Sequence, residues 1–402
     1  MARKRTTASR RAAWSAARRA PPRSRAQQLE TARLAALLDA TPRSRRLELI
    51  AADPRFHSWP LASRLLDAAA EFHWEEAGAG LEGCRLALAI AERLPAASHP
   101  DSLTGDLLAR AHGALADALR LDGRLPAARK SLERAWQAIE LGTGDPLEQA
   151  GLLRLEANLQ LTLGDGAAAA ALLRPAASIY RLHGERHQQG RTLQKLAIAV
   201  GHDDPAQGAA IAERAVALVA GGSDPRLELA ACHTLTWLLN DSGQAWAALD
   251  LFERSLPLYH KCGDSEPQLL MPWLEGRICR QLGELAVAER RFGEAWHRFR
   301  AAGFRQEQTL VCLDLAEVWT AQGKRRPAVG LLRKSEVWLR DWGMHREGLA
   351  AWVMVREAAG ADDGDIESAQ GLLREAAHYF RRAWRRPLPV PWAAGGHDRE
   401  NP

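Results

Sequence analysis

PQLLMPWLEGRICRQLGELAVAERRFGEAWHRFRAAG, residues 267–303, contains two helical patterns that meet at Gly283. Apolar or small side chains recur at the spacing of an amphipathic helix in both halves: Leu270, Leu274, Ile278 and Leu282, then Leu285, Ala288, Phe292, Ala295 and Phe299. Gly283 ends the first helix because glycine adopts the left-handed conformation of a helix end without strain. A connection this short makes the two helices antiparallel, so the stretch predicts a helix pair.

The same unit recurs six times along the chain. Its turn positions are Gly123, Gly164, Asp203, Gly243, Gly283 and Gly323, at intervals of 41, 39, 40, 40 and 40 residues. Small residues follow five places later (Ala128, Ala169, Gly208, Ala248, Ala288, Ala328) and seven places further on (Ala135, Ala176, Ala215, Ser255, Ala295, Ser335). Others stand seven places before the turn (Ala116, Ala157, Thr236, Gly276, Ala316, and Ala197 if the third turn is one residue short). Closing glycines are Gly142, Gly184, Gly221, Gly263, Gly303 and Gly343. Small residues at fixed helical places let helix backbones approach closely, so the pattern predicts stacked helix pairs.

This pattern resembles the tetratricopeptide repeat (TPR), which has glycine at the turn, alanine five residues later, a large apolar residue four after that and alanine three further on. Gly283, Ala288, Phe292 and Ala295 match these places. The unit here is 40 residues long, against about 34 in the usual repeat, which makes each helix nearly a turn longer. The run 273–277 also looks like that of bacterial repeat proteins. The resemblance implies an all-α fold, a right-handed α-solenoid of antiparallel helix pairs, and a scaffold rather than a chemistry.

The chain divides into five predicted segments. Residues 1–27 form a basic tail with nine Lys or Arg and no acid among the first 25, and such a segment buries too little apolar surface to fold. It is a solvated tail, a nucleic-acid-binding arm or a targeting segment. The other segments are a helical N-terminal cap (28–103), the six TPR-like pairs (104–343), C-terminal capping helices at 345–359 and 365–385 (344–386), and a flexible tail (387–402).

The N-terminal cap has its own helix signals. Helices are predicted at residues 28–39, 61–76 and 81–94. Thr41 followed by Pro42 reads as an N-cap and a first-turn proline, which open a helix through Ala51.

Composition favours a helical protein that works in the cytoplasm. The hydrophobic content of 47% is enough for a continuous core along a solenoid. No apolar run approaches the ~18 residues of a membrane span, so no membrane partner is expected. The five cysteines are isolated and odd in number, which favours a reducing setting with buried thiols.

No motif predicts catalysis, a cofactor or a metal site. A Walker-type phosphate loop is lacking, and His183 and His187 are separated by Gly184 at a helix end. The acidic run 362–365 lacks the rest of a calcium loop. We therefore expect a non-enzymatic protein without cofactor or metal.

In the TPR family the first helix of each pair lines an inner groove, at places thirteen, ten, six and three residues before the turn. The resemblance places these residues there: Arg110, Asp117, Arg120, Arg154, Asn158, Arg191, Gln194, His233, Trp237, Asn240, Trp273, Arg277, Arg280 and Glu317. Six arginines against two acids make this groove basic, and Arg and Trp are enriched at binding hot spots. The alternative is that the tryptophans pack between helices and that Arg277 pairs internally with Glu275 or Asp241.

These patterns predict a scaffold that binds a protein or peptide, with an acidic segment, in a basic groove containing tryptophan. Arginine binds carboxylates through two parallel hydrogen bonds, which suits such a ligand. One alternative is a ligand-responsive regulator of transcription or signalling, although neither a helix-turn-helix nor an effector domain is visible. Another is nucleic-acid binding through residues 1–25.

Overall fold

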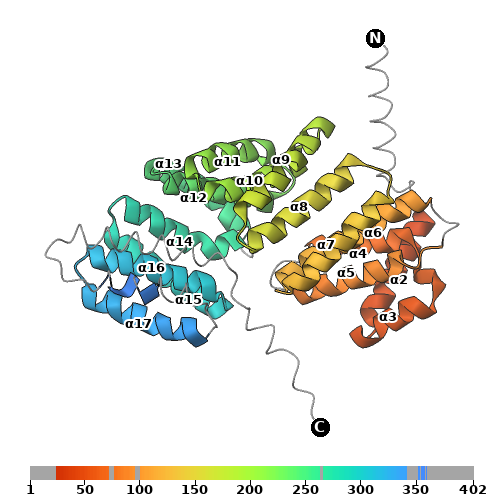
Figure 1. Cartoon of the computed structure of the whole chain (residues 1–402), viewed down its shortest axis with the longest axis horizontal. Helices are drawn as coiled ribbons and strands as arrows, with labels where there is room; N and C mark the ends of the chain where they lie inside the picture. Colours follow the sequence, from red (N-terminus) through yellow and green to blue (C-terminus); the bar gives the residue numbers. More distant parts are fainter. Residues whose placement is uncertain are drawn as a thin grey trace, which may run out of the picture. The chain divides into compact units, whose positions relative to one another are not determined.

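A computed structural model describes residues 24–71, 77–95, 100–262, 266–341, 352–353, 355–357 and 359. Regular structure within these ranges is entirely helical, so the all-α prediction is confirmed (Figure 1). The helices are α2 (Arg25–Ala40), α3 (Arg43–Ala52), the 3₁₀ helix η1 (Pro54–Phe56), α4 (Trp59–Glu71), α5 (Ala77–Ala91), α6 (Asp101–Leu121), α7 (Leu125–Glu140), α8 (Pro146–Thr162), α9 (Gly166–His183), α10 (Arg186–Gly201), α11 (Pro205–Val219), α12 (Pro225–Asp241), α13 (Ala245–Lys261), α14 (Glu266–Gln281), α15 (Leu285–Ala302), α16 (Arg305–Ala321) and α17 (Arg325–Asp341).

The chain forms two compact units. Unit 1 comprises residues 1–160 and 171–185, and unit 2 comprises 161–170 and 186–402. In unit 1, α4 packs on α5 and α6 on α7; in unit 2, α10 packs on α11, α12 on α13, α14 on α15 and α16 on α17. The helix pairing expected from the glycine turns is thus present in each unit.

The five turn glycines adopt the left-handed conformation that the sequence analysis predicted for them. Left-handed φ angles occur at the turn positions Gly123, Gly164, Gly243, Gly283 and Gly323. Asp203 fills the turn between α10 and α11 without a positive φ, since no described residue other than glycine has one. The prediction for Gly142 is wrong: Gly144, with φ of 72°, takes the left-handed conformation instead.

Small residues stand where helices come closest. Ala248, Ala288 and Ala328, five residues after their turns, have no exposed surface. A Cβ added to Gly208 would lie 2.4 Å from the Cα of Gly201. The backbones of α10 and α11 therefore touch at a point where no side chain fits.

The N-terminal helices begin slightly differently from the prediction. The Ser24 hydroxyl accepts a hydrogen bond from the Gln27 N–H (3.2 Å), and the Gln27 side chain accepts one from the Ser24 N–H (3.0 Å), so a capping box starts α2 three residues early. Thr41 does not cap α3. Its hydroxyl donates to the Leu37 carbonyl (2.7 Å) at the end of α2, and Pro42 directly precedes α3.

Several predictions fall outside the described residues: the basic tail through residue 23, the helix at 365–385 and the C-terminal tail. Within the helix predicted at 345–359, Trp352 is fully buried and its indole N–H donates to the Leu332 carbonyl at 2.8 Å. Among the helices that the structure describes, none has the length and apolar character needed to cross a bilayer.

Candidate functional site

Unit 2 brings predicted groove residues together on α12, α14 and α16, the first helices of consecutive pairs; we call this surface the first-helix face. The guanidinium carbon of Arg277 lies 4.4 Å from the centre of the Trp237 ring, a cation–π contact. Arg277 also donates a hydrogen bond to Asp241 at 2.8 Å. Trp237 meets Trp273 edge to face, with 5.0 Å between ring centres. Three predicted residues from two consecutive repeats therefore form one cluster.

Asp314 of α16 ties this cluster to the next pair. Its buried carboxylate accepts hydrogen bonds from the indole N–H of Trp273 (2.5 Å) and from Arg280 (2.9 Å), and Arg280 also pairs with Glu317. Burial alone would lower the pKa of the Arg280 guanidinium, but Glu317 and Asp314 raise it, so the charge is retained. Trp273 is 6% exposed and packs edge to face on Phe299. It lies between helices rather than on an open surface.

His233 and Asn240 extend the first-helix face along α12. Nδ1 of His233 lies 2.6 Å from the Tyr259 hydroxyl, and burial lowers the pKa of His233 to about 4. Asn240 is 4% exposed, and its side-chain oxygen has no hydrogen-bond partner in the structure. A buried acceptor of this kind is costly unless a donor reaches it.

Unfolding measurements should show a loss of stability as the pH falls from about 6.5 to about 4. The unfolded chain protonates His233 near pH 6.5, whereas the folded chain does so only near pH 4, so protons favour the unfolded state in this window. The shift corresponds to about 3 kcal/mol at its lower end. Urea unfolding of the wild type and of His233→Gln at pH 7.5 and 4.5 checks this. The variant should lose less stability on acidification, and an equal loss would contradict the assignment.

The predicted residues on α10 are engaged with α12. The Gln194 amide donates to the Thr234 hydroxyl at 2.8 Å. Arg191 and His187 each lie 3.2 Å from the Asp224 carboxylate, which also accepts the Leu227 N–H at the start of α12. These contacts connect successive first helices.

Unit 1 holds a second cluster of predicted residues, on α6 and α8. Asp117 accepts hydrogen bonds from Arg120 (2.8 Å) and Asn158 (3.4 Å). Burial alone would raise the pKa of Asp117, but Arg120 and Arg154 lower it, so the carboxylate is charged. Arg110 lies nearby on α6, 3.7 Å from Glu148 and over the Trp59 ring.

Carboxylates neutralise these arginines, and of the four only Asp241 was considered as a partner in the sequence analysis. Asp241, Asp314, Asp224 and Glu148 each pair with a predicted groove arginine. One signal could have found part of this set. The hydrogen bonds Asp117–Asn158, Gln194–Thr234 and Trp273–Asp314 join residues 41, 40 and 41 positions apart, so a polar residue one repeat further on is a natural partner.

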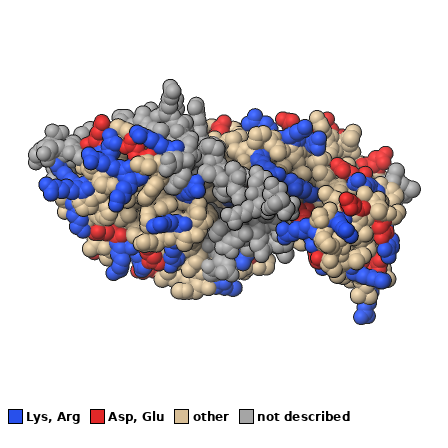
Figure 2. Space-filling view, turned by 90° about the horizontal axis from the view of Figure 1, so that it is seen from below, with Lys and Arg blue, Asp and Glu red and all other residues tan. Residues whose placement is uncertain are grey.

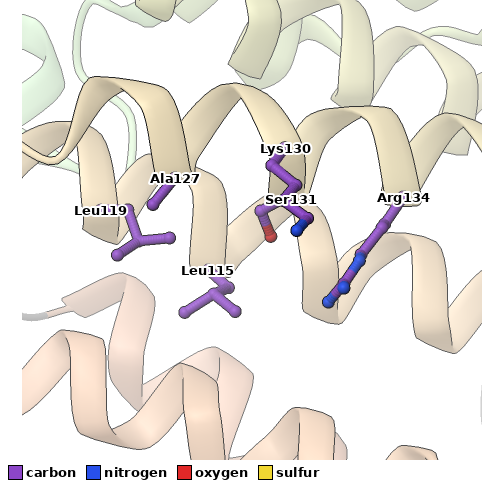
Figure 3. A pocket seen from close by; sticks show the side chains of 6 residues that line it. All are labelled: Leu115, Leu119, Ala127, Lys130, Ser131 and Arg134. Carbon is purple, nitrogen blue, oxygen red and sulfur yellow. The ribbon is translucent and has the colours of Figure 1, made fainter.

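A shallow cavity of about 230 Å³ lies beside α6 and α7 in unit 1. Figure 3 shows its lining residues: Leu115 and Leu119 from α6, and Ala127, Lys130, Ser131 and Arg134 from α7. Pockets for small ligands are usually about 300–1,000 Å³. None of the predicted groove residues lines this cavity, and we assign no ligand to it.

Comparisons with known proteins show the fold. No protein-family model matches the chain, and no curated protein matches it. A solved structure of a Rap protein complexed with competence and sporulation factor is similar with a TM-score of 0.60 and 15% identity, over 80% of this chain and 88% of that one. The Rap conjugation gene regulator of plasmid pLS20, in complex with the Phr* peptide, gives a TM-score of 0.51 and 11% identity, over 84% and 98%.

A third structure is a signal transduction ATPase (STAND) protein with a tetratricopeptide repeat sensor from Pyrococcus horikoshii. Its TM-score is 0.54 at 13% identity, over 88% of this chain and 53% of that one. At these identities the likeness concerns the fold, and it agrees with the helix pairs, glycine turns and buried small residues described above. The chain therefore has a TPR-like helical repeat fold.

Proposed function

We propose that the chain binds a peptide segment on the first-helix face of unit 2. The observation that carries the proposal is Arg277, whose guanidinium lies over the Trp237 ring and donates only part of its hydrogen bonds to described residues. A guanidinium has five N–H donors. Nη2 of Arg277 donates to Asp241, whereas Nε is buried and has no hydrogen-bond partner among the described residues. Its remaining donors suit a ligand carboxylate, which arginine binds in a bidentate manner.

Arg280 has a different role in this proposal. Its guanidinium is shared by Asp314 and Glu317, which are 1% and 10% exposed in their side chains. Removing either carboxylate from so buried a site is costly. Arg280 therefore positions Trp273 and α16, whereas Arg277 contacts the ligand.

Asn240 supplies a second, complementary group. It lies three residues after Trp237 on α12, a spacing that places two side chains on the same helix face. Its side-chain oxygen is buried and has no hydrogen-bond partner among the described residues, and in this proposal it accepts an N–H of the peptide main chain. An acidic peptide thus matches both Arg277 and Asn240.

The solved structures of the same fold support a peptide ligand, since one of them contains the Phr* peptide. Another is named aspartyl phosphate phosphatase F from Bacillus subtilis. The absence of catalysis in the present chain is therefore part of our proposal. It is supported by Asp314, the most buried carboxylate of the first-helix face, which accepts hydrogen bonds from Trp273 and Arg280.

Peptides selected from a random displayed library on the full chain should be enriched in Asp or Glu. Arg277→Glu is expected to weaken their binding at least about tenfold, because a hydrogen bond to a charged group contributes roughly 1.5–3 kcal/mol. Fluorescence anisotropy with labelled selected peptides measures the effect. Arg277→Gln belongs in the same series, since it removes the charge without placing a second carboxylate beside Asp241.

Arg254→Glu is the matched control. Arg254 lies on α13 and forms a solvent-exposed ion pair with Asp250 at 2.7 Å. Its reversal changes the net charge by the same amount as Arg277→Glu. Peptide binding should survive in this variant. Equal affinity of wild type and both Arg277 variants would refute the site, as would selected peptides without acidic residues.

A further inference from the structure

The second helices of unit 2 differ in charge along the chain. Because the repeat is 40 residues long, equivalent outward positions can be compared directly. Glu213 of α11 corresponds to Glu253 of α13, then to Gly293 of α15 and Arg333 of α17. The next position runs Arg214, Arg254, Glu294 and Lys334. An exposed Glu–Arg pair on α11 and α13 has therefore become an Arg–Lys pair on α17.

Among the side chains that the structure describes, the outward surfaces of α15 and α17 carry exposed cations, whereas the acids within these helices, Glu289, Glu294 and Glu336, are half-exposed or buried. The exposed Glu284 lies at the N-cap of α15. Five of these cations, which together define the α15–α17 basic face, are Arg290, Arg300, Arg326, Arg333 and Lys334. None of the five forms an ion pair with a carboxylate in the part of the chain that the structure describes. Lys and Arg side chains are numerous in the left part of Figure 2, with some Asp and Glu side chains between them.

Half-exposed or buried acids near this face are already neutralised. Glu289 pairs with Lys324 at 2.9 Å. Glu294 pairs with Arg291 and Arg298, at 3.0 and 2.6 Å. These acids therefore do not neutralise the five cations of the basic face, which can pair with the negative charges of a partner.

The two helices form one surface. Trp296 and Trp338 join them, with 6.3 Å between ring centres. Gly293 and Gly330 lie in the open, since a Cβ at either would meet nothing within 4 Å. Without side chains at these places, a large partner can approach the helices closely between the arginines.

We propose that the α15–α17 basic face binds the phosphate backbone of a nucleic acid. Arg290 and Arg300 are ten residues apart on α15, about 15 Å along the helix. Duplex DNA presents one charge per roughly 1.7 Å of its axis when both strands are counted, or about 3.4 Å along one strand, so this length spans about four phosphates of a single strand. The binding needs no base contacts and is independent of sequence.

A nucleic acid fits this face better than an acidic protein does. Protein interfaces have an apolar centre surrounded by a polar rim. Val337 is the exposed large apolar residue of α15 and α17 within the described ranges, and it does not form such a centre alone. Phosphate binding requires only positive charge and close approach. This site is separate from the proposed peptide site on the first helices, so either can fail without the other.

Fluorescence anisotropy of the full chain with a labelled mixed-sequence duplex DNA, and in parallel with a single-stranded RNA, tests the proposal. Five neutralised phosphates predict a slope of log affinity against log salt of about −4.5 for the duplex. Arg290→Gln/Arg333→Gln/Lys334→Gln should reduce the slope to about −1.8 and the affinity near 0.1 M salt on the order of 100-fold. The RNA arm shows whether the face prefers single strands.

The matched control removes the same charge from the neighbouring outer helices, as Arg214→Gln/Arg254→Gln/Lys261→Gln. These side chains are exposed on α11 and α13, and the variant should bind within about twofold of wild type. If both triple variants lost the same affinity for nucleic acid, the effect would come from net charge alone, and the proposed site would be wrong. Binding that disappears only when residues 1–25 are deleted would contradict the site as well. If neither the DNA nor the RNA binds at low salt, the proposal is also wrong, and an acidic protein becomes the expected partner of this face.

Discussion

Replacing Gly276 by leucine is expected to destabilise unit 2 by about 3 kcal/mol or more. Gly276 lies on α14 directly against α15. A Cβ there would stand 2.7 Å from two ring carbons of Phe292, and Phe292 has no exposed surface, so the ring has nowhere to move. Leucine adds three further carbons to this clash and forces the helix pair apart. Chemical denaturation followed by circular dichroism measures the loss.

Gly293→Ala on α15 is the control for this prediction. A Cβ at Gly293 meets nothing within 4 Å, and replacing glycine by alanine inside a helix stabilises it by up to about 1 kcal/mol. The two substitutions should therefore have opposite signs. Unfolding of Gly276→Leu at the same denaturant concentration as wild type would show that Gly276 is not at a helix contact.

Asp314→Ala should cost about 3–5 kcal/mol, the range found when one partner of a buried ion pair is removed. The Asp314 side chain is 1% exposed and accepts hydrogen bonds from Trp273 and Arg280. Its loss leaves a buried indole N–H without an acceptor and Arg280 with Glu317 alone. Because these contacts join α14 to α16, the stability of the whole stack of unit 2 depends on them. Urea unfolding quantifies the cost.

Two further variants separate the contribution of the Asp314 charge from that of its packing. Asp314→Asn keeps an acceptor for Trp273 but loses the charge that Arg280 requires, so an intermediate cost is expected. Asp250→Ala removes a carboxylate whose side chain is 66% exposed in an ion pair with Arg254, a change of at most about 1 kcal/mol. If Asp314→Ala proves no more harmful than Asp250→Ala, the buried network contributes nothing to stability.

Much of the site could be expected from the sequence because, in a stacked repeat, equivalent positions of successive repeats lie next to each other. The glycine turns and buried alanines follow from local backbone and packing requirements, which are readable in the chain. The 40-residue period then places Trp237, Trp273 and Arg277 on consecutive first helices, and the structure brings these three together.

The partners of the charged residues were harder to predict. Arg277 had two candidate partners, Glu275 and Asp241; it pairs with Asp241, and Glu275 pairs with Arg291. Residues two apart on a helix do not face each other, which disfavours Glu275 on geometric grounds. The choice of Asp241 depends on how α12 and α14 are rotated against each other, and the sequence pattern does not specify that rotation.

Periodicity alone was sufficient for the helical class, the antiparallel pairing and the turns, because these depend on residues close together in the chain. Only the tertiary structure decided which side of each helix meets its neighbour. That rotation buries Trp273 instead of exposing it, gives each described groove arginine of α14 a carboxylate partner, and turns Arg290, Arg333 and Lys334 to the surface. Side chains differ by about 100° around a helix from one residue to the next, so a rotation of the helix by that angle exchanges a buried residue for its neighbour in the sequence.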